Sequence, residues 1–153
     1  MICCFFGHRT INETELLKKQ LYEIIENLIR DKNTATFLFG SKSRFNDLCY
    51  ETTTKLLTKY PHIKRVYVRA EYPDIDDSYE KYLLEKYEDT YYPERALEAR
   101  RGVYIERNFD MIRKSQICVV YYNEDCLPTT RKSGTGIALS YAKKLKKQLI
   151  ILS

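Results

Sequence analysis

Short apolar runs alternate along the chain with longer segments in which apolar residues recur at helical spacing. Five runs have the length and the β-branched or aromatic content that are typical of β-strands. They occupy residues 2–6, 35–39, 63–69, 116–122 and 148–152. The pattern therefore predicts five strands with longer segments between them.

Helical periodicity is present in three of the intervening segments, which are residues 12–32, 44–60 and 133–147. In the first segment, Asn12 and Glu15 resemble a capping box, which predicts where the helix begins. In the second, Pro61 ends the pattern because proline cannot continue a helix. Each of these segments is expected to pack its apolar side against a sheet.

Residues 71–104 are less regular and contain seven of the 14 tyrosines together with Pro73 and Pro93. Tyrosine and leucine spacing predicts one amphipathic helix over about residues 78–88. The rest of the segment is expected to form a long loop or lid. A short helix around residues 105–114 is expected to lead into the fourth strand.

The alternation of strands and helices predicts an α/β fold, because parallel neighbours need crossover connections that cover both faces of the sheet. We expect a Rossmann-like three-layer sandwich with a mostly parallel five-stranded sheet, formed by residues 1–153 as a single domain. In such sheets, ligands bind beyond the carboxyl ends of the strands, near the point where strand order reverses. Function is therefore sought in the strand-to-helix loops.

Composition narrows the class of protein further. Apolar residues make up 44% of the chain and charged residues 31%, and no apolar stretch reaches membrane-spanning length. We expect a cytoplasmic protein with no membrane partner. The five cysteines include no CxxC pair and are expected to be reduced, and with only two histidines we expect no metal site and no cofactor.

The formal charge of +5 raises the question of a polyanionic partner. Lys and Arg are scattered, however, and the densest run, at residues 143–147, is explained by cations at the end of a helix. Nucleic acid therefore stays only a weaker alternative as a partner. The abundant tyrosines are consistent with a homodimer, since tyrosine-bearing faces often bury against a partner.

The loop Gly7-His8-Arg9 directly follows the first predicted strand. A glycine lets the backbone turn closely, free amides at a helix start attract anions, and an arginine can donate two hydrogen bonds to a phosphate. The alternative interpretation is a turn glycine beside a solvated arginine and a surface histidine.

Two further loops carry polar residues after predicted strands. Gly40 and Ser41 open a loop that lacks the spacing of a P-loop, and Ser43 in it could equally cap the next helix. Asp47 follows, where it either binds a ribose or complements the helix dipole. Glu71 comes after the third strand and either faces the ligand mouth or is a solvated loop residue.

In the fourth loop, Ser133-Gly134-Thr135-Gly136, two of the chain's five glycines flank a threonine at a helix start. Without a Cβ, each glycine lets a ligand approach the backbone amides closely. Capping by Ser133 or Thr135 explains one hydroxyl but leaves the two glycines unexplained.

Five segments in this order resemble the SLOG superfamily of Rossmann-like nucleotide-binding proteins, in its small single-domain bacterial branch. They are CCFFGHR (3–9), Phe39-Gly40, YIERNFDMI (104–112), YYN (121–123) and SGTGIALSYAKK (133–144). The superfamily includes the LOG phosphoribohydrolases and the core domain of DNA-processing protein A, and the likeness to the latter implies single-stranded DNA binding as a weaker alternative function. The resemblance covers nearly the whole chain.

The resemblance implies a nucleotide or nucleotide-derived ligand with its phosphate on the turn at Ser133, Gly134 and Thr135. The other ligand-binding residues it implies are Gly7, His8, Arg9, Gly40, Ser41, Arg107 and Asn108. Arg107 and Asn108 have an alternative role, in which they pair with carboxylates and hold the framework of the site.

Departures from the LOG pattern bear on catalysis. The glutamate of the LOG motif falls at Ala138, which cannot transfer a proton, and Glu71 and Asp47 are the remaining catalytic candidates. The favoured function is therefore a binding module that senses or sequesters a nucleotide. The alternative is an enzyme that hydrolyses the N-glycosidic bond of a nucleoside 5′-monophosphate.

Overall fold

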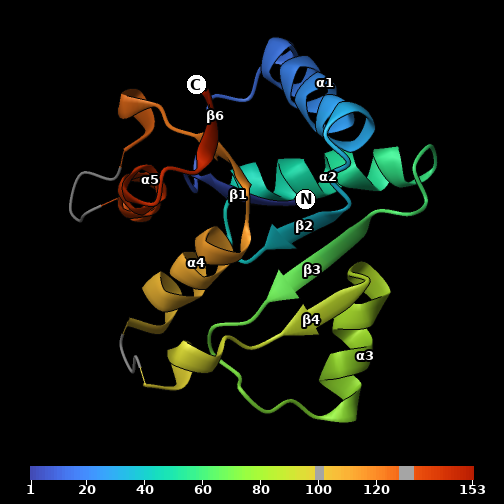
Figure 1. The fold of residues 1–153 in the computed structure, drawn as a ribbon, viewed down its shortest axis with the longest axis vertical. Helices are drawn as coiled ribbons and strands as arrows, with labels where there is room; N and C mark the ends of the chain where they lie inside the picture. Colours follow the sequence, from blue (N-terminus) through green and yellow to red (C-terminus); the bar gives the residue numbers. More distant parts are fainter. Residues whose placement is uncertain (99–101, 128–132) are drawn as a thin grey trace.

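The computed structural model of the protein describes residues 1–98, 102–127 and 133–153. A six-stranded sheet forms its centre, with the strand order β4-β3-β2-β1-β5-β6 and parallel pairing between all neighbours (Figure 1). The strands are β1 (Ile2–Gly7), β2 (Thr36–Phe39), β3 (Lys64–Val68), β4 (Asp89–Tyr91), β5 (Ile117–Tyr121) and β6 (Gln148–Leu152). The expected α/β, Rossmann-like architecture is confirmed.

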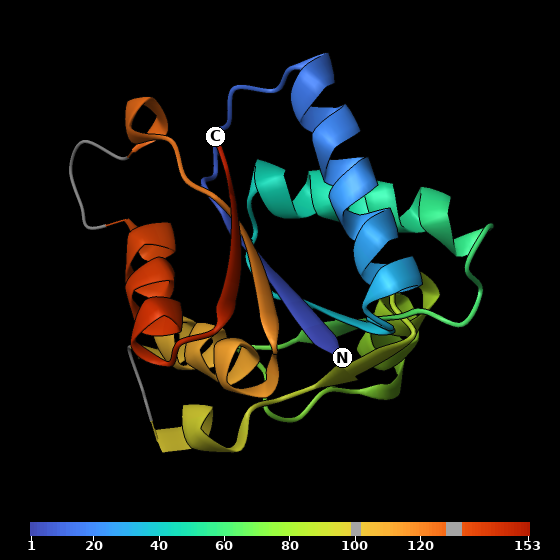
Figure 2. The same cartoon turned by 45° about the horizontal axis from the view of Figure 1, so that its top comes forward.

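Helices cover both faces of this sheet (Figures 1 and 2). They are α1 (Glu15–Asp31), α2 (Arg44–Leu57), α3 (Asp77–Lys86), α4 (Val103–Lys114) and α5 (Gly134–Lys144), with short 3-10 helices η1 (Glu94–Glu98) and η3 (Glu124–Cys126). Helices α1 and α2 pack on one face, whereas α4 and α5 pack on the other. Along β1, Cys3 and Phe5 join the first apolar cluster while Cys4 and Phe6 join the second, so the strand is buried on both faces.

The predicted number of strands was wrong, because the segment expected to be a loop or lid contains β4 as well as α3 and η1. Strand β4 is three residues long and pairs with β3 at the edge of the sheet. Its sequence, Asp89-Thr90-Tyr91, has no apolar run because an edge strand needs little burial. Strand β4 therefore forms because its backbone pairs with β3, and its own residues alone do not predict a strand.

The predicted cap of the first helix was also wrong. Thr14 is the N-cap of α1, and its hydroxyl accepts a hydrogen bond from the Leu17 amide at 3.0 Å. Asn12 lies in the preceding loop, where its amide donates to the Tyr121 hydroxyl at 3.0 Å. A contact with β5 therefore keeps Asn12 out of the helix.

The cysteines are free thiols, and four of the five are buried. Burial raises the pKa of the Cys3 and Cys49 thiols, so both remain neutral side chains in the core. Within the described ranges, no group of three or more metal-ligating side chains is present.

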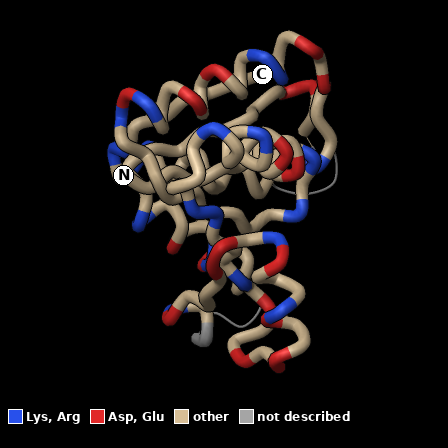
Figure 3. The backbone as a smooth tube through the Cα atoms, turned by 90° about the vertical axis from the view of Figure 1, so that its right-hand side faces the viewer, with Lys and Arg blue, Asp and Glu red and all other residues tan. Residues whose placement is uncertain are grey.

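The apolarity of the helices and the distribution of charged residues bear on membrane and polyanion binding. No helix in the part of the chain that the structure describes combines the length and apolarity needed to cross a bilayer. In Figure 3, Lys and Arg are interspersed with Asp and Glu along the chain. The excess of positive charge is therefore spread over the elements visible in that view.

Candidate functional site

Strand order reverses between β1 and β5, since β2, β3 and β4 lie on one side of β1 and β6 lies beyond β5. The chain leaves the carboxyl ends of β1 and β5 toward opposite faces, which opens a crevice between the two loops. A cleft of about 1010 Å³ lies at this edge of the sheet. Residues that follow β1, β2, β3 and β5 line it, together with the starts of α4 and α5.

The structure brings the ten predicted ligand-binding residues together at this cleft. Gly7, His8, Arg9, Gly40, Ser41, Arg107, Asn108, Ser133, Gly134 and Thr135 all line it. Of the two catalytic candidates, Glu71 also lines the cleft, whereas Asp47 is an exposed residue of α2 outside it. Position relative to the cleft therefore distinguishes these two carboxylates, which the sequence alone did not.

His8 is buried, with 4% of its surface exposed, so the alternative of a surface histidine was wrong. Its Nε2 atom accepts a hydrogen bond from the Asn123 amide at 3.1 Å. Burial lowers the pKa of His8, which favours the neutral ring at pH 7. With Nε2 as the acceptor, the hydrogen of the neutral ring is assigned to Nδ1.

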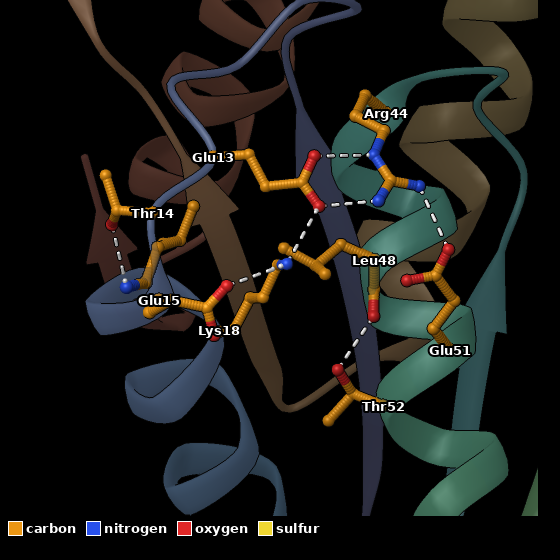
Figure 4. A network of polar contacts seen from close by, with 9 residues as sticks. Glu13, Thr14, Glu15, Lys18, Arg44, Leu48, Glu51 and Thr52 are labelled. Atoms are coloured by element: carbon orange, nitrogen blue, oxygen red, sulfur yellow. Dashed lines mark hydrogen bonds and ion pairs between the residues drawn. The ribbon is translucent and has the colours of Figure 1, made fainter.

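An ion-pair network fixes the loop that carries His8 and Arg9 (Figure 4). Arg44, at the start of α2, donates to both carboxylate oxygens of Glu13 at 2.9 and 2.5 Å and to Glu51 at 3.0 Å. The Arg44 backbone amide also donates to the Arg9 carbonyl at 3.0 Å. The β1–α1 loop is therefore attached to α2 by both the backbone and the side chain of Arg44.

We predict that this network makes stability depend on pH in acid. The hydrogen bond from Arg44 lowers the pKa of Glu13, so its stabilising contribution is complete above the unfolded-state pKa and is lost as pH falls through the lower folded-state pKa. In Glu13→Gln this contribution is absent at every pH. At pH 7, urea unfolding should show a free energy of unfolding that is lower in Glu13→Gln by less than about 1 kcal/mol, because the ion pair is solvent-accessible. This difference should shrink toward pH 3. A difference that stays constant would contradict this prediction.

Two of the cleft glycines are required by internal packing. A Cβ on Gly7 would lie 2.3 Å from the Phe45 Cβ atom. A Cβ on Gly40 would lie 2.7 Å from the Arg107 Cδ atom. The absence of a side chain at these positions is thus explained by the protein itself.

The glycines at the start of α5 are not explained in this way. A Cβ on Gly134 would meet no atom within 4 Å, and one on Gly136 would make an ordinary 3.5 Å contact with Ser133. None of the described glycines has a positive φ angle. Ser133 caps the helix by accepting from the Gly136 amide at 3.1 Å, whereas the amides of Gly134 and Thr135 lie in the first turn, where no intrahelical acceptor is available.

Arg107 is the buried cation of the cleft, with 5% of its surface exposed. Its Nη1 atom donates to the carbonyls of Gly40 at 2.7 Å and Val68 at 3.3 Å, and its Nε atom donates to Asn108 at 2.8 Å. Arg107 therefore joins the ends of β2 and β3. This agrees with the alternative role predicted for it, in which it holds the framework of the site. That alternative also had Arg107 pair with carboxylates, which was wrong, because no carboxylate among the described residues lies within 4.0 Å of its guanidinium.

The electrostatic balance of the cleft is positive. Its lining includes Arg9, Lys42, Arg69 and Arg107 as cations and Glu71 and Asp125 as carboxylates. A hydrogen bond from the Tyr104 hydroxyl lowers the pKa of Glu71. Among the described residues, the cleft therefore presents four cations against two carboxylates, one of which is already engaged by a tyrosine.

The sequence-based site set omitted Tyr67 and Tyr104, which also line the cleft. A signal for Tyr104 was available, since it precedes Arg107 by three positions and therefore shares its helix face. Tyr67 lies within β3, and the sequence alone does not distinguish it from a core residue.

No protein-family model matches the chain, and no curated protein is significantly similar to it in sequence. The resemblance to the SLOG superfamily therefore stays a prediction from the ordered motifs.

Proposed function

We propose that the protein binds a nucleotide or nucleotide-derived ligand in the cleft at the carboxyl edge of the sheet, as a sensor or sequestering module. The observation that carries the proposal is Arg107, a buried guanidinium whose hydrogen-bond partners among the described residues are carbonyl and amide oxygens, with no carboxylate in direct contact. Removing a cation from water is unfavourable unless an opposite charge compensates it. An anionic ligand would supply that charge.

The start of α5 supports phosphate as the anionic group. Its first-turn amides carry partial positive charge, and Gly134 leaves them open to close approach. His8 adds a neutral ring beside Asn123 on the adjacent loop. Phosphate binding at such a helix start uses backbone groups that every nucleotide can engage, so the base must be recognised elsewhere in the cleft.

A second candidate is an N-glycosidase that acts through Glu71. The observation in its favour is that Glu71 is an ionised carboxylate in the cleft, held by Tyr104. Such a group could activate water or stabilise an oxocarbenium-like sugar. Against it, the α5 position that matches the LOG glutamate is Ala138, a buried residue of the core. We therefore favour binding over turnover.

Purified protein incubated with nucleosides and their 5′-mono-, di- and triphosphates tests the proposal. A ligand at 100 times its Kd adds about 2.7 kcal/mol of stability, so at least one nucleotide should raise Tm by several degrees while its nucleoside does not. Chromatography of the same mixtures should detect no free base. Absence of stabilisation by every nucleotide would contradict the proposal, and base release that is lost in Glu71→Gln would favour the enzyme.

A further inference from the structure

Four tyrosines line the cleft around the end of β3. They are Tyr67 of β3, Tyr72 of the following loop, Tyr79 of α3 and Tyr104 of α4. The rings of Tyr72 and Tyr79 are 5.8 Å apart in a T-shaped arrangement. Tyr72 is 52% exposed and Tyr104 is 49% exposed, so both retain aromatic surface that the core does not use.

This aromatic wall is held in place by other parts of the protein. Arg69 donates to the backbone carbonyls of Tyr72 at 3.0 Å and of Pro73 at 3.3 Å. The ring of Tyr67 stacks on that of Tyr87 at 5.3 Å. A partly exposed aromatic surface with such supporting contacts is a suitable platform for a nucleobase, since every base has a flat face that can stack.

The groups that favour an anion lie toward the other end of the cleft. Gly134 and Thr135 begin α5 after β5, and His8 follows β1. His8 is a second, independent polar group at this end, because it is 4% exposed and yet lines the cleft. The start of α5 follows β5, whereas Tyr67 and Tyr72 of the aromatic wall belong to β3 and the loop after it.

Strand order gives the spacing between β3, which carries Tyr67 and leads to Tyr72, and β5, which precedes α5. Strand β5 is three steps from β3 in the sheet, which corresponds to about 14 Å at about 4.8 Å per step. Lys42 follows β2, which lies between β3 and β5 in the sheet, and Arg107 donates hydrogen bonds to the carbonyls of Gly40 and Val68 at the ends of β2 and β3. Both cations thus belong to the part of the cleft at the ends of β2 and β3, beside the aromatic wall.

A nucleoside 5′-monophosphate is too short for this span. Roughly six single bonds of about 1.5 Å separate its phosphorus atom from the base, which places the phosphate and the centre of the base roughly 8 Å apart. Each further phosphate in a chain adds about 3 Å, on the same bond lengths. A ligand that fills both ends needs additional phosphates between them.

Building on the proposed nucleotide-binding function, we propose that the ligand is a nucleoside joined to a chain of two or more phosphates. Its base stacks on Tyr72 and its neighbours, its inner phosphates lie beside Lys42 and Arg107, and its terminal phosphate lies at the start of α5. The cleft is thereby a divided site, with an aromatic subsite and an anion subsite.

Calorimetric titration with the mono-, di- and triphosphates of one nucleoside series tests the length requirement. The Kd is expected to fall at least tenfold from the monophosphate to the triphosphate. Equal affinity for the two would overturn this inference and leave the proposed nucleotide binding standing. Binding of no nucleotide at all would overturn both.

Two matched tyrosine variants test the aromatic subsite. Tyr72→Ala removes a ring from the cleft, whereas Tyr82→Ala removes a ring that is also about half exposed, at 50%, but lies outside it. Tyr72→Ala is expected to weaken nucleoside triphosphate binding about tenfold and to leave inorganic triphosphate binding unchanged, while Tyr82→Ala changes neither. Equal effects of the two variants, or equal loss of inorganic triphosphate and nucleotide binding in Tyr72→Ala, would overturn the assignment.

Discussion

Replacing Gly7 with alanine is expected to lower the free energy of unfolding by about 3 kcal/mol, the upper end of the usual range for overpacking. The added Cβ would lie 2.3 Å from the Cβ atom of Phe45, a fully buried residue in the first turn of α2. A Cβ atom is fixed to its backbone, so no side-chain rotation relieves the overlap and the start of α2 has to shift. Urea unfolding measures the loss.

Gly134→Ala is the matched control for this prediction. A Cβ at that position meets no atom within 4 Å, and alanine favours helix more than glycine does. The free energy of unfolding should be unchanged or should rise by less than about 1 kcal/mol. If Gly7→Ala were as stable as Gly134→Ala, the close packing of β1 on Phe45 would be contradicted.

Replacing Gly134 with glutamate is expected to weaken nucleotide binding by at least 100-fold without unfolding the protein. A carboxylate at this position occupies the open space in front of the α5 amides and repels a phosphate. The same charge in the first turn of a helix is favourable to the fold. Calorimetry with the tightest-binding nucleotide, paired with urea unfolding, measures both effects.

Ser140→Glu provides the matched control, since it adds the same charge to an exposed position of the same helix away from the cleft. It should retain binding within about threefold of the unsubstituted protein, because Ser140 is six residues further along the helix and an exposed charge there is screened by salt. Comparable loss in the two variants would mean that net charge, and not the start of α5, governs binding.

Much of the fold could be predicted from the sequence because strands buried on both faces need continuous apolar runs. The expected run at residues 2–6 lies within β1, and the expected run at 116–122 contains β5, and the central residues of both strands are buried. The capping role considered for Ser43 is confirmed, because its hydroxyl accepts from the Asn46 amide at 3.1 Å. These features depend on neighbouring residues, so local sequence is sufficient.

The features that the sequence did not predict depend on distant partners. Strand β4 exists through pairing with β3, and Asn12 is kept out of α1 by Tyr121. His8 is buried through its contact with Asn123, which is 115 residues away in the chain. Local patterns contain no information about such contacts.

The glycines of the site illustrate the same limit. Gly7 and Gly134 both follow a predicted strand and precede or begin a helix, and both were assigned to ligand binding. Three-dimensional packing distinguishes their roles, since a side chain at Gly7 would overlap Phe45 whereas Gly134 faces open space. The sequence could predict where the candidate site lies but not which of its glycines the fold itself requires.

Nuclear magnetic resonance of the backbone amides provides the most direct test of phosphate binding at the start of α5. The protein is titrated with a nucleoside triphosphate and, separately, with the uncharged nucleoside, while the Gly134, Thr135 and Gly136 resonances are followed. We predict large, saturable shifts of the Gly134 and Thr135 amides with the nucleotide alone, and a smaller shift of Gly136, whose amide already donates to Ser133. Unchanged Gly134 and Thr135 resonances at nucleotide concentrations that saturate binding would contradict the account.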